Sequence, residues 1–321
     1  MRMHQAREHI LTRLGMSGSP VSGDDLAREL GLSRTGVWKH IQVLKKSGAD
    51  IQAHAGKGYV LKSNVFSAGL LQAKLSTQRI GQHVLVLEET GSTNQDIMQQ
   101  AEAGADEGLV IFANRQLSGK GRLGRRWHTM PESLAGSVLL RPDLAPEHVP
   151  QLSLLTAVAL HDALSNYAPD IRIKWPNDLL CGGAKVAGIL TEMRAEPGRV
   201  NAVVLGFGIN LKSPMDGWPA DITQKVTDME SISHQRINKL EIAVAVLSAL
   251  DQWYEIYLKH GFAPLRKAWW QAHAASGDKV RVHHGNGYIE GVASALDDDG
   301  ALLLKTDAGV QRIIAGDLEL L

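Results

Sequence analysis

Apolar positions three or four residues apart dominate the start of the chain, and this spacing predicts three amphipathic helices. Ser22 and Ser33 stand where N-caps would open the second and third helices, and Gly31 stands where the second would end. Two short helices joined by a tight glycine turn are typical of a helix-turn-helix. The residues expected on the buried faces are Ile10, Leu11 and Leu14, then Leu26 and Leu30, then Val37, Ile41 and Leu44.

Further along the chain, continuous and alternating apolar runs predict strands. Residues 50–61 indicate two strands around Lys57, a hairpin that resembles the wing of winged-helix DNA-binding domains. Gly182 and Gly183 indicate another hairpin, between residues 179–181 and 185–192. Further strands are predicted at 83–88, 108–113, 133–140, 171–175 and 203–211, and short strands follow residue 276 with turns at 285–287, 297–300 and 307–309.

Helical patterns separate these strands and complete the expected architecture. They fall at residues 70–75, from residue 95 onward, at 152–164 and over 238–273, the last with a break near 261–264. No element is assigned within 214–236. The order indicates an α+β chain of three domains. These are a winged helix-turn-helix over 1–65, a mixed α/β domain over 66–273 and a small antiparallel β-barrel over 274–321.

Composition narrows the class of protein. The chain has 321 residues, of which 44% are hydrophobic, as in an ordinary globular protein. No run approaches the length of a membrane helix and the first residues lack an apolar signal segment, so we expect a cytoplasmic protein without a membrane partner. Cys181 is the single cysteine, which excludes an internal disulfide and a cysteine metal cluster; we expect it to be a small buried apolar residue.

The distribution of charge indicates a binding partner for the N-terminal domain. The net charge of the chain is zero, but residues 1–63 hold ten Lys and Arg against five Asp and Glu. A basic helix-turn-helix is expected to bind DNA through phosphates and base edges. A helical docking domain with a solvated basic face is the alternative, favoured mildly by Gly36 and Trp38. The DNA-binding residues are expected within Ser22 to Ile41, mainly Ser33, Arg34, Thr35, Trp38, Lys39 and Gln42, with Lys57 in the wing.

A loop rich in glycine and arginine follows the strand predicted at 108–113. The range Arg115–Trp127, here named the glycine-basic loop, holds three glycines and five cations and no acid. Glycine backbone N–H groups and arginine forks suit a phosphate or a carboxylate. The loop also matches the G-x-G-x-x-G dinucleotide fingerprint, but Pro131 follows where that fingerprint requires an apolar helix. A solvated basic surface loop remains the other alternative.

Small polar residues flank other predicted elements. Ser92, Thr93 and Asn94 precede a helix, where they would cap its N-terminus, hold a polar ligand, or both. Lys185 sits at the turn of the 179–192 hairpin, where it could point into a pocket. Gly206 and Gly208 interrupt an apolar strand, which indicates a close approach by a ligand or another backbone.

Five motifs in this order resemble the bifunctional biotin–protein ligases that also repress biotin operons. They are GSTN at 91–94, QLSGKGRLGRRW at 116–127, KWPND at 174–178, KVAGILTE at 185–192 and GFGIN at 206–210. With the flanking helix-turn-helix and barrel, the resemblance covers nearly the whole chain. It implies a central domain of the biotin/lipoate ligase type and an SH3-like C-terminal barrel.

The resemblance also implies roles for individual residues. Lys185 and Arg122 would be the catalytic residues. The biotin-binding set would be Ser92, Thr93, Asn94, Gln116, Lys120, Gly121, Arg122, Lys185, Gly188 and Leu190. The ATP and adenylate set would be Gly119, Lys120, Arg122, Arg125, Trp127, Asn177 and Asn210. Lys120 departs from the family, which usually has arginine there, so a bidentate phosphate contact at this position is in doubt.

The implied reaction uses ATP, biotin and Mg²⁺, with no protein site dedicated to a metal. Biotin carboxylate would attack the α-phosphate of ATP to give biotinyl-5′-AMP, and a lysine of a biotin carboxyl carrier protein would displace AMP. The adenylate would also favour a homodimer that binds operator DNA. Lipoate–protein ligase and a biotin-sensing repressor without ligase activity are the alternatives. Pyrophosphate exchange with biotin, lipoate or octanoate would separate the three.

Overall fold

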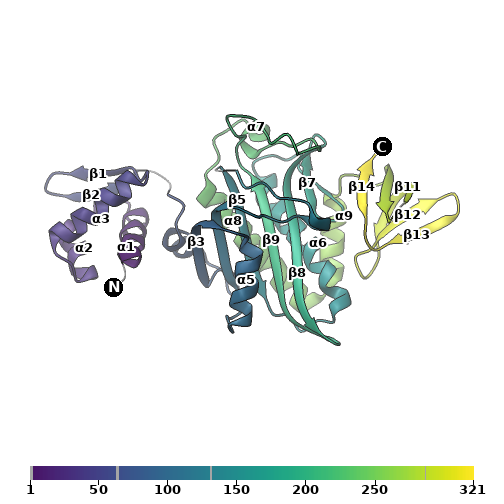
Figure 1. The fold of residues 1–321 in the computed structure, drawn as a ribbon, viewed down its shortest axis with the longest axis horizontal. Helices are drawn as coiled ribbons and strands as arrows, with labels where there is room; N and C mark the ends of the chain where they lie inside the picture. Colours follow the sequence, from purple (N-terminus) through teal and green to yellow (C-terminus); the bar gives the residue numbers. More distant parts are fainter. Residues whose placement is uncertain (1–2, 63–64, 131, 286) are drawn as a thin grey trace.

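The computed structural model describes residues 3–62, 65–130, 132–285 and 287–321. Pro131 and Asn286, on which two of the sequence-based arguments fall, lie outside the described residues. Three parts of the chain follow one another along the longest axis (Figure 1). A helical N-terminal part lies at one end, a large sheet with helices occupies the middle, and a small sheet lies at the other end.

The N-terminal part is the expected winged helix-turn-helix. Ser22 Oγ accepts from the backbone of Asp24, and Ser33 Oγ accepts from the backbone of Gly36, so both predicted N-caps are confirmed. Gly31 ends the second helix with φ 63°, a left-handed conformation that suits glycine. The elements are α1 Met3–Met16, α2 Gly23–Leu30, α3 Arg34–Lys46, β1 Ile51–His54 and β2 Gly58–Leu61, and β1 pairs with β2.

The first helix connects this part to the centre. Glu8 Oε2 accepts from the backbone N–H of Gly69 at 2.9 Å, and Gly69 lies in the first turn of α4 Ala68–Lys74. Gly15 leaves room for the Leu70 side chain, because a Cβ there would lie 2.2 Å from Leu70 Cδ2. The helix-turn-helix therefore packs on α4 through α1.

A mixed seven-stranded sheet forms the central domain, in the order β3-β4-β5-β9-β8-β7-β6. Strands β3 and β4 are parallel, and every other neighbouring pair is antiparallel. The turn between β7 and β8 holds Gly182 and Gly183, both with positive φ, as the hairpin prediction required. The bounds are β3 His83–Thr90, β4 Leu109–Gln116, β5 Ser133–Leu140, β6 Arg172–Lys174, β7 Asp178–Cys181, β8 Ala184–Glu196 and β9 Arg199–Asn210.

Helices cover both faces of this sheet. On one face α5 packs over a small cluster that includes Ile97, Ile111 and Val204. On the other face α6, α8 and α9 enclose the main core, and Val110 and Phe112 of β4 point into it. The alternation along β4 thus buries both sides of the strand. The helices are α5 Thr93–Glu102, α6 Val149–Ser165, α7 Met229–Ser233, α8 Lys239–His260 and α9 Phe262–Ala272.

The C-terminal domain is one antiparallel sheet in the order β13-β12-β11-β10-β14. His273 connects it to the centre, because its Nδ1 lies 2.9 Å from the Ile173 carbonyl oxygen and its ring stacks on Trp269. Burial lowers the pKa of His273 to about 4, so the ring is neutral at physiological pH. The strands are β10 Lys279–His284, β11 Gly287–Leu296, β12 Leu302–Thr306, β13 Gly309–Ile313 and β14 Asp317–Leu320.

Two local expectations need correction. Helix α5 begins at Thr93 rather than Gln95, and Ser92 occupies its N-cap position without a side-chain cap hydrogen bond. Cys181 is only partly buried, because it ends an edge-side hairpin strand next to the glycine turn. The break predicted near 261–264 is confirmed, because helices α8 and α9 meet at Gly261. The unassigned polar segment contains the short helix α7.

Candidate active site

A cavity of about 840 Å³ opens over the central sheet. It lies within the usual size range of small-molecule sites. Its walls come from the start of α5, the glycine-basic loop, the 174–178 turn, strands β8 and β9, and residues 221–224. His283, Asp317, Leu318 and Glu319 of the C-terminal domain also line it. The cavity therefore needs two domains for its walls.

Glycines make the floor flat enough for an aromatic ring. Gly188 of β8 pairs with Gly208 of β9, and a Cβ on Gly208 would lie 2.2 Å from Cζ2 of Trp127. A Cβ on Gly188 would lie 3.3 Å from Cζ3 of the same ring. Lys185 Nζ lies 5.7 Å from the centre of this ring, within cation–π distance. The last residue of the glycine-basic loop thus rests on the sheet.

One end of the cavity is a neutral hydrogen-bonding network. The backbone N–H of Thr93 donates to Gln116 Oε1 at 2.8 Å, and Gln116 Nε2 donates to Thr129 Oγ1 at 3.0 Å. Ser137 Oγ of β5 donates to Asn94 Oδ1 at 2.6 Å, below the start of α5. Side chains of Thr93, Asn94 and Gln116 are thereby held by their protein partners before any ligand arrives.

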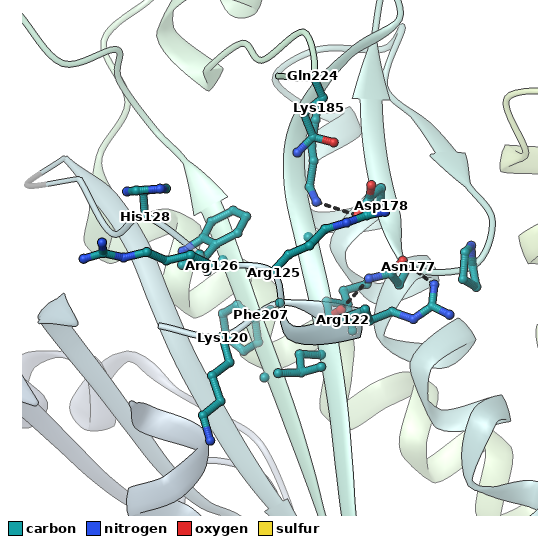
Figure 2. A pocket seen from close by; sticks show the side chains of 18 of the residues that line it. Lys120, Arg122, Arg125, Arg126, His128, Asn177, Asp178, Lys185, Phe207 and Gln224 are labelled. Atoms are coloured by element: carbon teal, nitrogen blue, oxygen red, sulfur yellow. Dashed lines mark hydrogen bonds and ion pairs between the residues drawn. The ribbon is translucent and has the colours of Figure 1, made fainter. Parts of the chain in front are cut away.

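The other end carries the charges (Figure 2). Lys185 Nζ lies 2.7 Å from Asp178 Oδ1, and both side chains are largely buried. Arg122 Nη1 donates to Asn177 Oδ1 at 3.2 Å. Burial lowers the pKa of Arg122, although Asp317 and Asp178 act in the opposite direction. Arg122 remains a cation, because even a lowered guanidinium pKa stays far above neutral pH.

The C-terminal domain closes this charged end. Asp317, the first residue of β14, forms an ion pair with Arg125 and lies 3.9 Å from Arg122 Nη1. The Gly316 carbonyl oxygen accepts from Arg122 at 3.4 Å. The glycine-basic loop is therefore attached to a strand almost two hundred residues later in the sequence.

Two loops meet at another part of the cavity wall. His128 Nε2, just after the glycine-basic loop, lies 2.9 Å from Asp221 Oδ2. The segment carrying Asp221 is fixed at its far end, where the Lys185 N–H donates to the Lys225 carbonyl and the Thr227 N–H donates to the Lys185 carbonyl, both at 2.9 Å. The backbone N–H and the backbone carbonyl of Lys185 are thus both hydrogen-bonded to this segment.

The structure brings most of the expected site residues together. Those that line the cavity are Ser92, Thr93, Asn94, Gln116, Lys120, Gly121, Arg122, Arg125, Trp127, Asn177, Lys185, Gly188 and Leu190. Gly119 and Asn210 do not line it. The Gly119 carbonyl accepts from the Trp127 backbone at 2.9 Å, and Asn210 Nδ2 donates to the Thr227 carbonyl at 3.0 Å. In Figure 2 the Lys120 side chain extends away from the Lys185–Asp178 pair.

Sequence reasoning missed several residues of the site. His128, Asp178, Asp221, His283 and Asp317 line the cavity without having been assigned a role. Asp178 belongs to the KWPND motif and was within reach of motif reasoning, since a carboxylate beside a predicted cationic site is a natural partner. The others carry no local signal, because only the tertiary fold brings them to the cavity.

The expected DNA-binding side chains form an exposed surface. Arg34, Thr35, Trp38 and Lys39 of α3 are exposed, and Trp38 keeps 50% of its surface accessible. Arg34 Nε lies 3.0 Å from Asp24 Oδ1 at the start of α2. Lys57 is exposed at the turn between β1 and β2. The helix and the wing thus both present cations to solvent.

Neither a metal cluster nor a membrane helix occurs in the described part of the chain. Among the described residues, His, Cys, Asp and Glu form no group of three that could hold a metal ion. No helix within the described ranges is long and apolar enough to cross a membrane.

Three family models match the chain in order. The HTH domain matches residues 6–60, the biotin/lipoate A/B protein ligase family matches 86–210, and the biotin protein ligase C-terminal domain matches 275–321. Each match falls within a different one of the three parts of the fold.

The names of similar proteins agree with these family models. The chain is 35% identical to the bifunctional ligase/repressor BirA of Bacillus spizizenii, with 98% of each chain covered. It is 34% identical to the biotin–[acetyl-CoA-carboxylase] ligase of Paracoccus denitrificans, over 73% of this chain and 98% of that protein. The biotin protein ligase of Aquifex aeolicus, solved with biotin and ATP, superposes with a TM-score of 0.64 at 26% identity and covers 74% of this chain and 98% of that one. The chain belongs to the family of bifunctional biotin–protein ligases and repressors.

Proposed function

We propose that this cavity activates biotin with ATP and transfers the biotinyl group to a lysine of an acceptor protein. The observation that carries the proposal is the division of one cavity into a neutral hydrogen-bonding end and a cationic end, joined by a flat glycine floor. Biotin has the matching shape, because its ureido ring is neutral and polar and its carboxylate lies at the far end of an apolar chain. The acceptor named for a relative is acetyl-CoA carboxylase, and its biotin carboxyl carrier part is the expected substrate.

The chemistry follows from charge and position. Biotin carboxylate attacks the α-phosphate of ATP, pyrophosphate leaves, and biotinyl-5′-AMP forms; the acceptor amine then attacks the biotinyl carbonyl and AMP leaves. Lys185 and Arg122 bring positive charge to the reacting carboxylate and the α-phosphate. The glycine-basic loop excludes water from the mixed anhydride by resting over the floor.

Mg²⁺ fits this site through the nucleotide rather than through a protein cage. Mg²⁺ is commonly held by one or two carboxylates together with substrate phosphates. Asp178 is a carboxylate at the cationic end, and the described residues provide no three-ligand cluster. Asp178 would therefore hold the ion, and the bound ion would neutralise phosphate charge.

We extend the proposal to repression. Biotinyl-AMP held in the cavity would favour a homodimer in the cytoplasm, and two exposed α3 helices would read a palindromic operator. The support is the basic N-terminal surface and the name of the full-length relative, a ligase/repressor. Footprinting with biotinyl-AMP tests this part separately from catalysis.

Biotin-dependent exchange of labelled pyrophosphate into ATP is the decisive experiment, with lipoate and octanoate as controls. Exchange with biotin alone is the expected result. Exchange with lipoate would instead assign the chain to the lipoate ligases of the same family. Biotin binding without any exchange would indicate a sensor that lacks the chemistry.

A further inference from the structure

Three buried or half-buried polar residues are hydrogen-bonded in series at the neutral end of the cavity, and two of them lie outside the expected biotin-binding set. Ser137 of β5 is fully buried, and Glu192 of β8 lies beside the start of α5. Asn94 stands between them, since its amide contacts both side chains. The directions of these hydrogen bonds follow from which atoms are able to donate.

Asn94 has only one possible orientation. Its Nδ2 lies 3.2 Å from the Leu190 carbonyl oxygen and 2.7 Å from Glu192 Oε2. A backbone carbonyl can only accept, so the amide nitrogen must face Leu190 and Glu192. The amide oxygen is therefore directed to Ser137 Oγ, at 2.6 Å.

The same reasoning extends to Thr93. Asn94 Oδ1 can only accept, so the single hydroxyl hydrogen of Ser137 is directed to it. Gln116 is oriented as well, because its Oε1 accepts the backbone N–H of Thr93 at 2.8 Å. Thr93 Oγ1 then lies 2.7 Å from Ser137 Oγ and 3.2 Å from Gln116 Oε1. Two hydroxyl oxygens this close need a hydrogen between them, so the hydrogen of Thr93 is directed to Ser137 Oγ and none is left for a ligand.

We infer that Glu192, Asn94 and Ser137 are positioning residues that leave Thr93 Oγ1 as an obligate hydrogen-bond acceptor toward the ligand. The neutral end then selects ligands that present an N–H donor there. Thr93 lines the cavity, so its remaining lone pair can reach such a donor. The inference rests on the proposed function and deepens it, because the ureido ring of biotin offers two N–H groups and the dithiolane ring of lipoate offers none.

The energetic reason is the cost of an unpaired buried acceptor. A site built to bind an N–H rejects analogues that lack it, since its polar atom is then desolvated without a partner. An analogue that presents an oxygen is worse still, because two acceptors would face each other. Selection therefore arises from hydrogen-bond direction, not from the size of the ring.

The test compares biotin with analogues of nearly the same shape, by calorimetric titration of the full chain. One probe is the pair of cyclic carbamates in which either ureido N–H is replaced by oxygen. The other is dethiobiotin, which keeps both N–H groups and loses the sulfur. We expect one carbamate to bind the unmodified chain about 100-fold more weakly than biotin. This ratio is the carbamate penalty.

Variants of the three positioning residues should reduce the carbamate penalty. Asn94→Leu and Ser137→Ala are each expected to lower it to about tenfold or less, because Gln116 Oε1, at the longer distance of 3.2 Å, is then the only protein acceptor that competes with the ligand for the hydrogen of Thr93. Glu192→Met should lower it too, whereas Glu192→Gln keeps an acceptor oxygen and should retain most of it. Ser294→Ala is the matched control, since Ser294 donates to the Leu303 carbonyl in the distant C-terminal sheet.

The ratio of the dissociation constants of dethiobiotin and biotin, here named the dethiobiotin ratio, separates a change in hydrogen-bond direction from a general loss of the site's structure. It should stay constant across all variants, because the three positioning residues act on the hydrogen bond to the ureido end, which dethiobiotin shares with biotin. An unchanged carbamate penalty in Asn94→Leu and Ser137→Ala would overturn the inference while biotin binding still supported the proposed function. A parallel fall of both ratios would also overturn it. Failure of the unmodified chain to bind biotin would overturn the proposed function itself.

Discussion

At the scale of single residues, the buried pair of Lys185 and Asp178 determines how the charged end works. Their atoms are 2.7 Å apart, and each side chain is 14% exposed. A buried pair of this kind costs desolvation energy, and removing one partner leaves an uncompensated charge. We therefore attribute the pair to the proposed reaction rather than to stability: the carboxylate would hold the lysine in place for an anionic substrate.

Lys185→Met should reduce biotin-dependent pyrophosphate exchange by more than about 100-fold, because charge stabilisation of the transition state is removed. Lys212→Met is the control, since Lys212 is 55% exposed and lies 3.9 Å from Glu230. Urea unfolding of Lys185→Met measures separately how much stability the stranded carboxylate of Asp178 costs. Near-normal exchange by the single variant would refute the role of Lys185.

Lys239 shows the opposite case, a cation whose burial costs stability. Its Nζ lies 4.9 Å from the centre of the Phe66 ring and 3.3 Å from Asn114 Oδ1. Burial lowers its pKa from 10.5 to about 8, despite the nearby carboxylates of Glu88 and Glu132. The unfolded chain therefore binds more protons than the folded chain between pH 8 and 10.5, so stability rises with pH in this window.

Lys239→Met should remove this dependence. We expect the variant to have a larger free energy of unfolding than the unmodified chain at low pH. This difference between the two proteins should be about 2 kcal/mol larger at about pH 7.5 than at about pH 10. Urea unfolding of both proteins at the two pH values measures it, and the difference between them cancels other titrating groups. A gain that is the same at both pH values would contradict the assigned burial of the ammonium group.

At the scale of elements, the glycines of strands β8 and β9 shape the floor of the cavity. Gly206 leaves room for Asn94, because a Cβ there would lie 2.1 Å from Asn94 Oδ1. Gly208 leaves room for the Trp127 ring in the same way. Both glycines lie on the α5 face of β9, two residues apart, as the alternation of a strand requires.

Gly208→Ala should therefore displace Trp127 from the floor and weaken biotin binding by about tenfold or more, a cost in the range of overpacking. Calorimetric titration with biotin measures the weakening, and circular dichroism checks the fold. Gly18→Ala is the matched control, because a Cβ at Gly18 meets nothing within 4 Å. Equal biotin affinities for the two variants would show that the ring does not depend on this glycine.

The glycine-basic loop and the segment 221–224 should hold the adenylate through the hydrogen bond between His128 and Asp221. His128→Gln and Asp221→Asn are each expected to release bound biotinyl-AMP several-fold faster, in line with about 1 kcal/mol for such a hydrogen bond. A chase of labelled adenylate measures the rate, and the double variant should add little to either single one. His161→Gln is the control, since His161 lies 3.4 Å from Asp162 on α6, away from the cavity. Strictly additive effects would argue against a direct interaction.

The features best predicted from the sequence are those that depend on a few neighbouring residues. The buried strands, the caps at Ser22 and Ser33, and the hairpin turn at Gly182 follow from periodicity and glycine conformation, and all are confirmed. Asn210 shows the limit: strand alternation places it on the same side as Gly208, but the following segment covers it and takes its amide hydrogen. Asp317 carries no signal at all, because it meets Arg125 only after the C-terminal sheet docks.

At the scale of the whole molecule, the cavity lies in the central and C-terminal domains, whereas α3 and the wing belong to the N-terminal domain. The C-terminal sheet contributes walls to the cavity, whereas the winged helix-turn-helix lies beyond the opposite side of the central domain (Figure 1). Its described attachment runs through α1 and α4, including the hydrogen bond from Gly69 to Glu8. Substitutions on the exposed face of α3 should therefore alter DNA binding without altering the ligase reaction.

Lys39→Ala and Lys57→Ala test this separation and distinguish a DNA-binding domain from a docking domain. Each should weaken operator binding in the presence of biotinyl-AMP. Each should also reduce the slope of the logarithm of the binding constant against the logarithm of the salt concentration, by about 0.9 for each phosphate that is no longer neutralised and hence by about 2 for a symmetric dimer. Pyrophosphate exchange should remain unchanged. Lys259→Ala is the control, because Lys259 is also exposed, on α8, and lies far along the chain from α3. If both variants bound DNA with the salt dependence of the unmodified chain, the basic surface would serve another partner, and repression would lack its physical basis.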